Sequence, residues 1–415
     1  GENTFPATIT ATDGMGNKTV ITDSIKVDTV PHPLTFNTTA EDNVINKVES
    51  AGEVTVTGQS TAGAMVTVTL GSNTQTVETG ANGTWTVKYP AGTFTADGTS
   101  MTLNASTVDA AGNPSSSTQT IKIDTTTSVS FTTQPLFGGD NIINGTEANG
   151  EVTMSGISEV GTKSVSVVWN NTTVPAVMSA DGSSWTVKFP SSAVPATGSS
   201  IATVNSIDAA GNPGTNTRTI AVDRETTVSV NAGQAGGDNT IMSTEANAGV
   251  TLTGKAEAGA KVEVTFQGKT HTVTASDTGT WSTKFESSEI KRGTYSNTSD
   301  NTVNVKATDI AGNIATTTHT LNVDTEVTNF VRTSLSTGTD NVLNNAEALN
   351  GLTVNGTVEV GAQSVSVTFG TYGTYPATVN AAAGTWTVTI PAGVIPQGEN
   401  TFPATITATD GMGNK

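Results

Sequence analysis

Acidic residues recur at fixed intervals along this sequence, and their side chains are the ones best suited to do chemistry. The motif Asp-x-x-Gly-Asn begins at five positions that lie 96 to 101 residues apart: Asp13, Asp109, Asp208, Asp309 and Asp410. A further aspartate follows the start of the motif by 15 residues, at Asp28, Asp124, Asp223 and Asp324. A catalytic site normally occurs once in a chain, and no nucleophile paired with a histidine is visible. The repeated carboxylates therefore indicate a repeated cation site, and we do not expect an enzyme.

A second acidic motif lies near the start of each repeat. It consists of Asp-Asn followed six residues later by a glutamate, and it occurs at Asp42-Asn43 with Glu49, Asp140-Asn141 with Glu147, Asp238-Asn239 with Glu245, and Asp340-Asn341 with Glu347. We expect this loop and the closing aspartate to lie at module ends. The sequence therefore predicts junctions at which Asp109, Asn113 and Asp124 of one module face Asp140, Asn141 and Glu147 of the next.

Calcium is the cation that this residue set favours. Carboxylates crowded at a junction repel one another without a partner. Ca²⁺ accepts six to eight carboxylate, amide and backbone oxygens in irregular geometry. Zinc and copper favour histidine and cysteine, but the chain has no cysteine and its three histidines occupy no repeated position. The predicted calcium ligands are Asp13, Asp28, Asp42, Asn43, Glu49, Asp109, Asp124, Asp140, Asn141, Glu147, Asp208, Asp223, Asp238, Asn239, Glu245, Asp309, Asp324, Asp340, Asn341 and Glu347.

An alternative interpretation gives these residues a purely local role. Asp and Asn side chains often accept hydrogen bonds from their own turns, and Asn113 and its equivalents suit that role best. The sequence favours calcium for the acids because they recur at module ends while the expected strands contain almost none.

Composition limits the partners of the chain. Its 415 residues carry a net charge of −18 with only 13% charged residues, so acid is concentrated in a few places. Nucleic acid and anionic membranes require lysine and arginine, so neither is an expected partner. No apolar run approaches the ~20 residues of a membrane-spanning helix, so we expect no membrane insertion in this segment.

The repeat defines the expected domains. We expect residues 1–28 to be the last two strands of a preceding module, followed by modules at 29–124, 125–223, 224–324 and 325–415, the last of them without its final strand. Residues 1–18 are identical to residues 398–415, so the chain reads as a window on a longer array with a period of 397 residues.

The strand pattern is clearest in the third module. Apolar and polar residues alternate in runs such as 262–266 and 303–307, and glycine, asparagine and aspartate cluster between the runs. About seven such runs per hundred residues indicate an all-β fold. We predict tandem immunoglobulin-like, seven-stranded Greek-key β-sandwiches in an elongated rod.

One tryptophan recurs in each module, at Trp85, Trp185, Trp281 and Trp386. Such residues could be sugar-stacking platforms, but their periodicity favours one central core tryptophan per sandwich. Trp169 aligns with inward-facing positions and is expected in the core as well.

The segments GTWTVKYPAG (83–92), DGTSMTLNASTVDAAGNPS (97–115) and IKIDT (121–125) resemble the Ig-like extender repeats of giant repeats-in-toxin and biofilm-associated bacterial adhesins. The element around Asp42–Glu49 is similar to one in the central repeats of an ice-binding adhesin. The resemblance implies calcium-stiffened stalks on the cell surface that project a distal ligand-binding region for adhesion or biofilm formation. Two departures are Met242, where other modules have asparagine, and Arg224, where they have threonine.

The expected function is therefore a structural extender outside the cell, whose partners are neighbouring similar repeats. The alternative is a carbohydrate- or receptor-binding module, which would need exposed aromatic residues or a loop unique to one module. The incomplete fourth module also predicts head-to-tail strand complementation, in which the N-terminal strands of one copy complete the last sandwich of another.

Overall fold

The computed structural model describes residues 3–132, 137–296, 298–337, 340–398 and 401–415. The chain divides into two compact units. The first comprises residues 1–143 and 147–222, and the second comprises residues 144–146 and 223–415. Each is described separately below. Within the described residues, no helix has the length and apolar character needed to cross a membrane.

The first unit begins with a two-stranded antiparallel hairpin of β1 (Asn3–Thr12) and β2 (Lys18–Val27), followed by the module at 29–124. This module packs the sheet β3-β5-β8 against the sheet β4-β10-β9-β6-β7. Its elements are β3 (Leu34–Phe36), η1 (Thr39–Glu41), β4 (Val44–Ile45), α1 (Lys47–Ser50), β5 (Val54–Ser60), β6 (Met65–Leu70), β7 (Asn73–Glu78), β8 (Thr84–Tyr89), β9 (Ser100–Val108) and β10 (Pro114–Ile123).

The module at 125–223 repeats this arrangement with the sheets β11-β13-β17-β16 and β12-β19-β18-β14-β15. Its elements are β11 (Val129–Phe131), η2 (Phe137–Gly139), β12 (Ile142–Ile143), α2 (Gly145–Ala148), β13 (Val152–Ser158), β14 (Ser164–Trp169), β15 (Thr172–Pro175), β16 (Val177–Met178), β17 (Ser184–Phe189), η3 (Ser191–Ala193), β18 (Gly198–Ile207) and β19 (Pro213–Val222).

The second unit contains the module at 224–324, with the sheets β20-β22-β25, β24-β23-β27-β28 and β21-β29-β26. Its elements are β20 (Val228–Val230), η4 (Ala235–Gly237), β21 (Thr240–Met242), α3 (Ser243–Ala248), β22 (Val250–Ala256), β23 (Lys261–Phe266), β24 (Lys269–Thr274), β25 (Thr280–Phe285), η5 (Ser287–Glu289), β26 (Thr294–Tyr295), η6 (Ser299–Asn301), β27 (Thr302–Thr308), β28 (Ile314–Thr320) and β29 (Asn322–Asp324).

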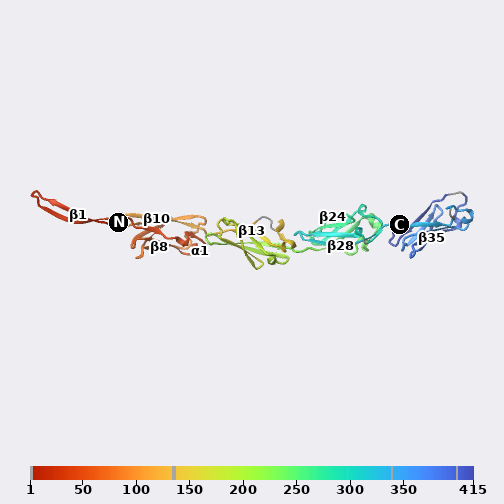
Figure 1. Ribbon diagram of the computed structural model, residues 1–415, viewed down its shortest axis with the longest axis horizontal. Coiled ribbons are helices and arrows are strands. Elements are labelled where there is room, and N and C mark those ends of the chain that lie inside the picture. The colour runs from red at the N-terminus through yellow and green to blue at the C-terminus, as the bar shows by residue number, and fades with distance from the viewer. Residues whose placement is uncertain (1–2, 133–136, 297, 338–339, 399–400) are drawn as a thin grey trace. The chain divides into compact units, whose positions relative to one another are not determined.

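The last module contains the sheets β30-β31-β35-β34 and β33-β32-β36. Its elements are β30 (Val331–Leu335), α4 (Asn345–Ala348), β31 (Leu352–Thr357), β32 (Ser364–Phe369), β33 (Thr374–Pro376), β34 (Thr378–Asn380), β35 (Thr385–Ile390), η7 (Ala392–Val394) and β36 (Ala404–Thr409). Figure 1 draws the four modules in orange, yellow-green, cyan and blue.

Each module has its own hydrophobic core. The four core clusters lie within residues 34–123, 129–222, 235–323 and 348–408, inside the four predicted modules, whose exact boundaries remain a prediction. The repeated tryptophans and Trp169 are at most 3% exposed. The sequence prediction that they are core residues is therefore confirmed, and they cannot serve as sugar-stacking platforms.

The all-β, immunoglobulin-like fold follows from the period-two pattern, because alternate side chains of β6, β23 and β32 enter the core. The sequence pattern missed four short helices, α1 to α4, of four to six residues. Each contains the glutamate of the second acidic motif, and a helix of one to two turns is too short to produce a helical period.

A glycine opposite each of the four repeated tryptophans permits the sheet to pack. A Cβ atom at Gly356 would overlap the Trp386 ring and the carbonyl of Val331, whereas one at Gly393 would meet nothing within 4 Å. The equivalent glycines Gly58, Gly156 and Gly254 face their own tryptophans in the same way.

We therefore predict that Gly356→Ala lowers the free energy of unfolding of the last module by about 3 kcal/mol, because the added methyl group overpacks the core. Hydrogen exchange of β31 and β35 in the whole chain measures the effect. Gly393→Ala in the same module is the matched control and should leave that exchange unchanged. Equal exchange in the two variants would contradict this account of the core.

Candidate metal centre

The Asp-x-x-Gly-Asn motif forms a closed turn between the last two long strands of a module. In the second module, Asp208 Oδ1 accepts a hydrogen bond from the Asn212 amide N–H at 2.8 Å, and Asp208 Oδ2 accepts one from Asn212 Nδ2 at 2.8 Å. Gly211 has a φ of +93°, a conformation that favours glycine. The turn thus fixes both residues, and Asp208 is only 2% exposed.

The asparagine of this turn connects neighbouring modules. Asn212 Nδ2 also donates to the backbone oxygen of Asp124 at 2.8 Å, and Asn212 Oδ1 accepts the N–H of Lys47 at 2.8 Å. Lys47 is the first residue of α1. The backbone N–H groups at the start of a helix have no acceptor within that helix, so they need one from outside it. One side chain thereby links the closing aspartate and the short helix of one module to the turn of the next. We call this arrangement the asparagine clamp.

The clamp occurs twice more, in the second unit. Asn313 Nδ2 donates to the Asp223 oxygen at 2.9 Å, and Asn313 Oδ1 accepts the N–H of Gly145 at 2.7 Å. Asn414 makes the same two contacts with the Asp324 oxygen at 2.9 Å and with the N–H of Ser243 at 2.8 Å.

The clamp brings carboxylates together. Asp223, Glu257 and Asp309 each offer an oxygen atom, and these atoms all lie within 4.8 Å of one another. Burial raises the pKa of Asp223, and the neighbouring charge of Asp309 raises it further. The pKa of Glu257 is also raised, first by burial and then by the charges of Asp223 and Asp309.

The junctions of Asp124 and Asp324 have a similar electrostatic pattern. Burial raises the pKa of Asp124, and the charges of Asp208, Glu159 and Asp97 add to the effect. Burial likewise raises the pKa of Asp324, with contributions from Asp410 and Glu359. A raised carboxyl pKa means that the folded state disfavours the ionised form. Without a cation, these groups stabilise the fold most below the ordinary aspartate pKa, and that stabilisation is lost as the pH rises through the raised values.

Such a set of oxygens can hold a hard divalent cation. Three carboxylates bring up to six oxygens and three negative charges, which suits Ca²⁺ in both number and type of ligand. Zinc and copper fit less well, because the group contains neither histidine nor cysteine.

The structure corrects the predicted pairing of motifs across a junction. The turn Asp109–Asn113 and the closing Asp124 lie at opposite ends of the ten-residue strand β10, about 30 Å apart, so they cannot share a junction. Asn113 instead donates to the oxygen of Asp28 at 3.2 Å. The expectation that Asp109, Asn113 and Asp124 face Asp140, Asn141 and Glu147 is therefore wrong, because the true pairing joins Asp124 to the Asp208 turn.

The second acidic motif mainly serves its own loop. The Oδ1 atoms of Asp42, Asp140, Asp238 and Asp340 each accept the backbone N–H two residues ahead, at 2.8–3.0 Å. Asn43, Asn141, Asn239 and Asn341 all have positive φ values. Glu49, Glu245 and Glu347 accept the N–H of the residue that precedes their helices, at 2.9–3.0 Å. These contacts agree with the alternative interpretation, in which Asp and Asn side chains bond within their own turns. Glu147 also has interactions in the structure.

The predicted ligands do not include Glu159, Glu257 and Glu359, which are the glutamates beside the three closing aspartates. They also leave out Asp410, although the sequence identifies it as the start of the fifth Asp-x-x-Gly-Asn motif. A signal exists, because each glutamate lies in a Gly-x-x-Glu-x-Gly segment, at 156–161, 254–259 and 356–361. The equivalent segment at 58–63 has Thr61 in place of the glutamate. The junction of Asp28 and Asp109 therefore lacks this acid.

The structure also shows where the two sequence departures, Met242 and Arg224, lie. Met242 precedes α3, and Glu245 still accepts its N–H at 3.0 Å, but the methionine side chain supplies no strong acceptor for the amides of α3. This helix contacts Asn414, so Met242 lies at the junction of the third and fourth modules. The backbone of Arg224 lies against Gly145.

Comparisons with known proteins agree with this architecture. No protein-family model matches the chain, and no curated protein matches it. Among solved structures, a Ca²⁺-stabilised ice-binding adhesin of an Antarctic bacterium is 31% identical, with 92% of this chain and 95% of that chain covered and a TM-score of 0.39. A 1.5-MDa bacterial ice-binding adhesin is 27% identical, with 72% of this chain and 100% of that chain covered and a TM-score of 0.38.

A single immunoglobulin-like domain of the M. primoryensis ice-binding adhesin is 33% identical, with 22% of this chain and 95% of that domain covered and a TM-score of 0.19. Because these TM-scores are low, the assignment rests on the identity and coverage of the first match. The chain belongs to the family of immunoglobulin-like repeats of large bacterial adhesins.

The asparagine clamp generates a prediction. Asn313→Ala removes two hydrogen bonds between modules, each with a net value of about 1 kcal/mol, and should therefore increase the exchange rate of the Gly145 amide at least tenfold. Hydrogen exchange read by NMR measures this rate.

Asn17→Ala is the matched control. Asn17 makes the same bonds to Asp13 within its turn, and no bond from its side chain to another module is found in the described part of the chain. An unchanged Gly145 amide in the Asn313 variant would show that the clamp does not hold the junction.

Proposed function

We propose that this chain is a stalk segment of a large bacterial surface adhesin, in which calcium at the module junctions stiffens the array. The observation that carries the proposal is the group Asp223, Glu257 and Asp309, in which acids from two modules lie within reach of one ion. The 31% identity to a Ca²⁺-stabilised adhesin supports it independently.

Calcium would change the balance of forces at each junction. Without an ion, the hydrogen bonds of the clamp act against the mutual repulsion of three carboxylates in a partly buried site. An ion bound by acids of both modules converts that repulsion into attraction. The junction then resists bending, and a row of sandwiches becomes a stiff spacer.

The expected affinity matches a location outside the cell. Extracellular calcium modules bind with dissociation constants of about 10⁻⁴–10⁻³ M. We place the chain at the bacterial surface, where it would hold a distal ligand-binding region away from the cell for adhesion or biofilm formation. The acids recur at equivalent positions in successive modules, and this repetition supports a function without catalysis.

Small-angle scattering before and after chelation tests the proposal. With calcium, four modules of about 35–40 Å should give a maximum dimension of about 150 Å. Chelation should broaden the distribution of distances and increase the apparent flexibility, because the junctions become hinges. A profile that is identical in both conditions would contradict the proposal.

A variant localises the effect to one junction. Glu257→Gln removes one charged ligand and should weaken calcium binding at that junction about tenfold, measured by calorimetry. Asp277→Asn makes the same change of charge in an exposed turn of the same module and is the control. Equal titration curves for the two variants would exclude Glu257 as a ligand.

A second copy of the chain is the partner that we propose for two exposed strand edges. Strands β9, β18 and β27 each pair with two neighbours, whereas β36 pairs only with β32 among the described residues. Strand β2 carries Val20, Ile21 and Ile25 at 54–60% exposure. Addition of β2 from another copy to β36 would cover the unpaired edge of β36 and the exposed apolar side chains of β2.

Sedimentation velocity over a range of concentrations tests this complementation. The chain should form dimers and longer species as its concentration rises, and Ile25→Asp on β2 should prevent them. A strictly monomeric wild-type chain at high concentration would contradict the proposal.

A further inference from the structure

The last module contains a loop that the other three modules lack. The hairpins β6–β7, β14–β15 and β23–β24 have two-residue loops, because Leu70 pairs with Asn73, Trp169 with Thr172 and Phe266 with Lys269. In the last module Thr368 pairs with Thr374, and the Phe369 N–H donates to the Gly373 oxygen at 2.9 Å. Three residues, 370–372, therefore remain in this loop, and the third of them is an aromatic residue.

The backbone holds this loop in one conformation. Gly370 and Gly373 have φ values of +47° and +124°, which favour glycine at both positions. The Tyr372 N–H donates to the Phe369 oxygen at 2.8 Å, and Tyr375 Oη donates to the Tyr372 oxygen at 3.0 Å. The Tyr372 side chain is nevertheless 40% exposed, so the loop presents its ring to solvent.

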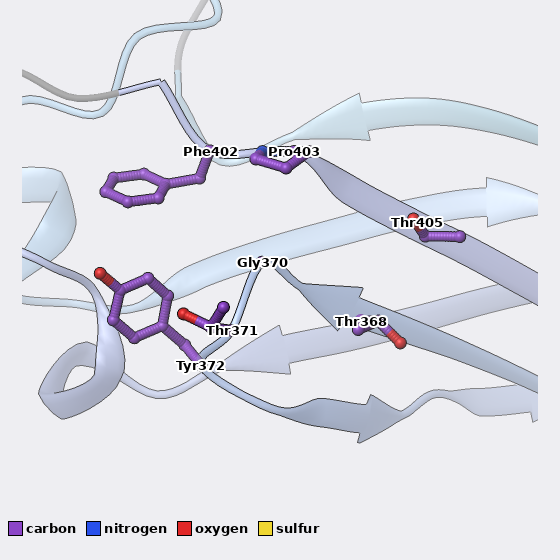
Figure 2. A pocket seen from close by; sticks show the side chains of 7 residues that line it. All are labelled: Thr368, Gly370, Thr371, Tyr372, Phe402, Pro403 and Thr405. Carbon is purple, nitrogen blue, oxygen red and sulfur yellow. The ribbon is translucent and has the colours of Figure 1, made fainter.

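A cavity of about 330 Å³ lies beside this ring. Figure 2 shows Tyr372 and Phe402 facing one another on one side of the cavity, with Thr368 and Thr405 on the other. The ring centroids of Tyr372 and Phe402 are 5.5 Å apart, with an interplanar angle of 84°. Pro403 and Thr371 complete the wall together with Gly370.

The lining limits the class of ligand. No lining residue carries a charge, so the cavity offers no oppositely charged partner for a phosphate, a carboxylate or a basic side chain. It offers aromatic faces together with the hydroxyl groups of Tyr372 and three threonines. Thr371 and Thr405 hydroxyls have no hydrogen-bond partner within the described residues, whereas Thr368 bonds to Thr374 at 2.9 Å. Apolar faces next to neutral donors and acceptors match a sugar ring, which has C–H faces and a rim of hydroxyls.

We propose that this cavity of the last module binds a neutral hexopyranose unit of a glycan. The sugar stacks a C–H face on Tyr372, and its hydroxyls bond to Thr371 and Thr405. The cavity volume lies within the range of small-molecule sites, and the fixed loop reduces the entropy lost on binding. The last module then contacts glycan itself, in addition to the spacer role proposed for the array.

Glycan binding by the whole chain tests the proposal. The probes are methyl glycosides of glucose, galactose, mannose and N-acetylglucosamine at millimolar concentrations, followed by saturation-transfer NMR, and an array of neutral oligosaccharides. At least one neutral sugar should bind, and Tyr372→Ala should weaken its binding about tenfold because the stacking surface is lost. Thr371→Ala, which leaves the aromatic pair in place, should weaken binding by a smaller factor.

Ser72→Ala, at the tip of the equivalent loop in the first module, is the control and should leave binding unchanged. Binding should also persist in a chelator, which separates this site from the proposed calcium junctions. Failure of every neutral sugar to bind would overturn the proposal. So would binding that is equal in the Tyr372 and Ser72 variants, or binding that is restricted to charged glycans or apolar peptides.

Discussion

The close approach of like charges at each junction is the constraint on which the array depends. Oxygen atoms of Asp223, Glu257 and Asp309 lie within 4.8 Å of one another, and the charges of neighbouring acids raise the pKa of Asp124 and of Asp324 at two further junctions. At each of these three junctions one asparagine side chain bonds to the backbone of the closing aspartate and of the short helix. Burial of these acids raises the pKa of Asp124, Asp223 and Asp324. The clamp therefore contributes to the register between modules, while the charges of the acids oppose their close approach.

The modules differ where these charges meet, although their cores are alike. Asp97 adds a fourth acid near Asp124, and its oxygens accept bonds from Thr125 and Thr126. Thr61 stands where the other modules have a glutamate, so the junction of Asp28 and Asp109 has one acid fewer. Sandwiches of one fold can thus present junctions of different charge, because the loops at a module's end vary while the alternating strands that form its core do not.

The strands, the buried tryptophans and the closing aspartates could be predicted from the sequence, because each follows a local period of two or a repeat of about one hundred residues. The grouping of Asp223, Glu257 and Asp309 could not be predicted from the sequence. Glu257 lies 34 residues after Asp223 and 52 before Asp309, so only tertiary packing brings the three together. The local role of Asp42 depends on a hydrogen bond to Val44 that composition does not reveal. The opposite positions of Asp109 and Asp124 depend on the length of β10.

Anomalous diffraction from crystals of this chain grown with calcium tests the central claim most directly. The account predicts a calcium peak among Asp223, Glu257 and Asp309, with oxygen ligands about 2.4 Å away, and equivalent peaks beside Asp124 and Asp324. Density for water alone, with these carboxylates turned separately into solvent, would contradict it.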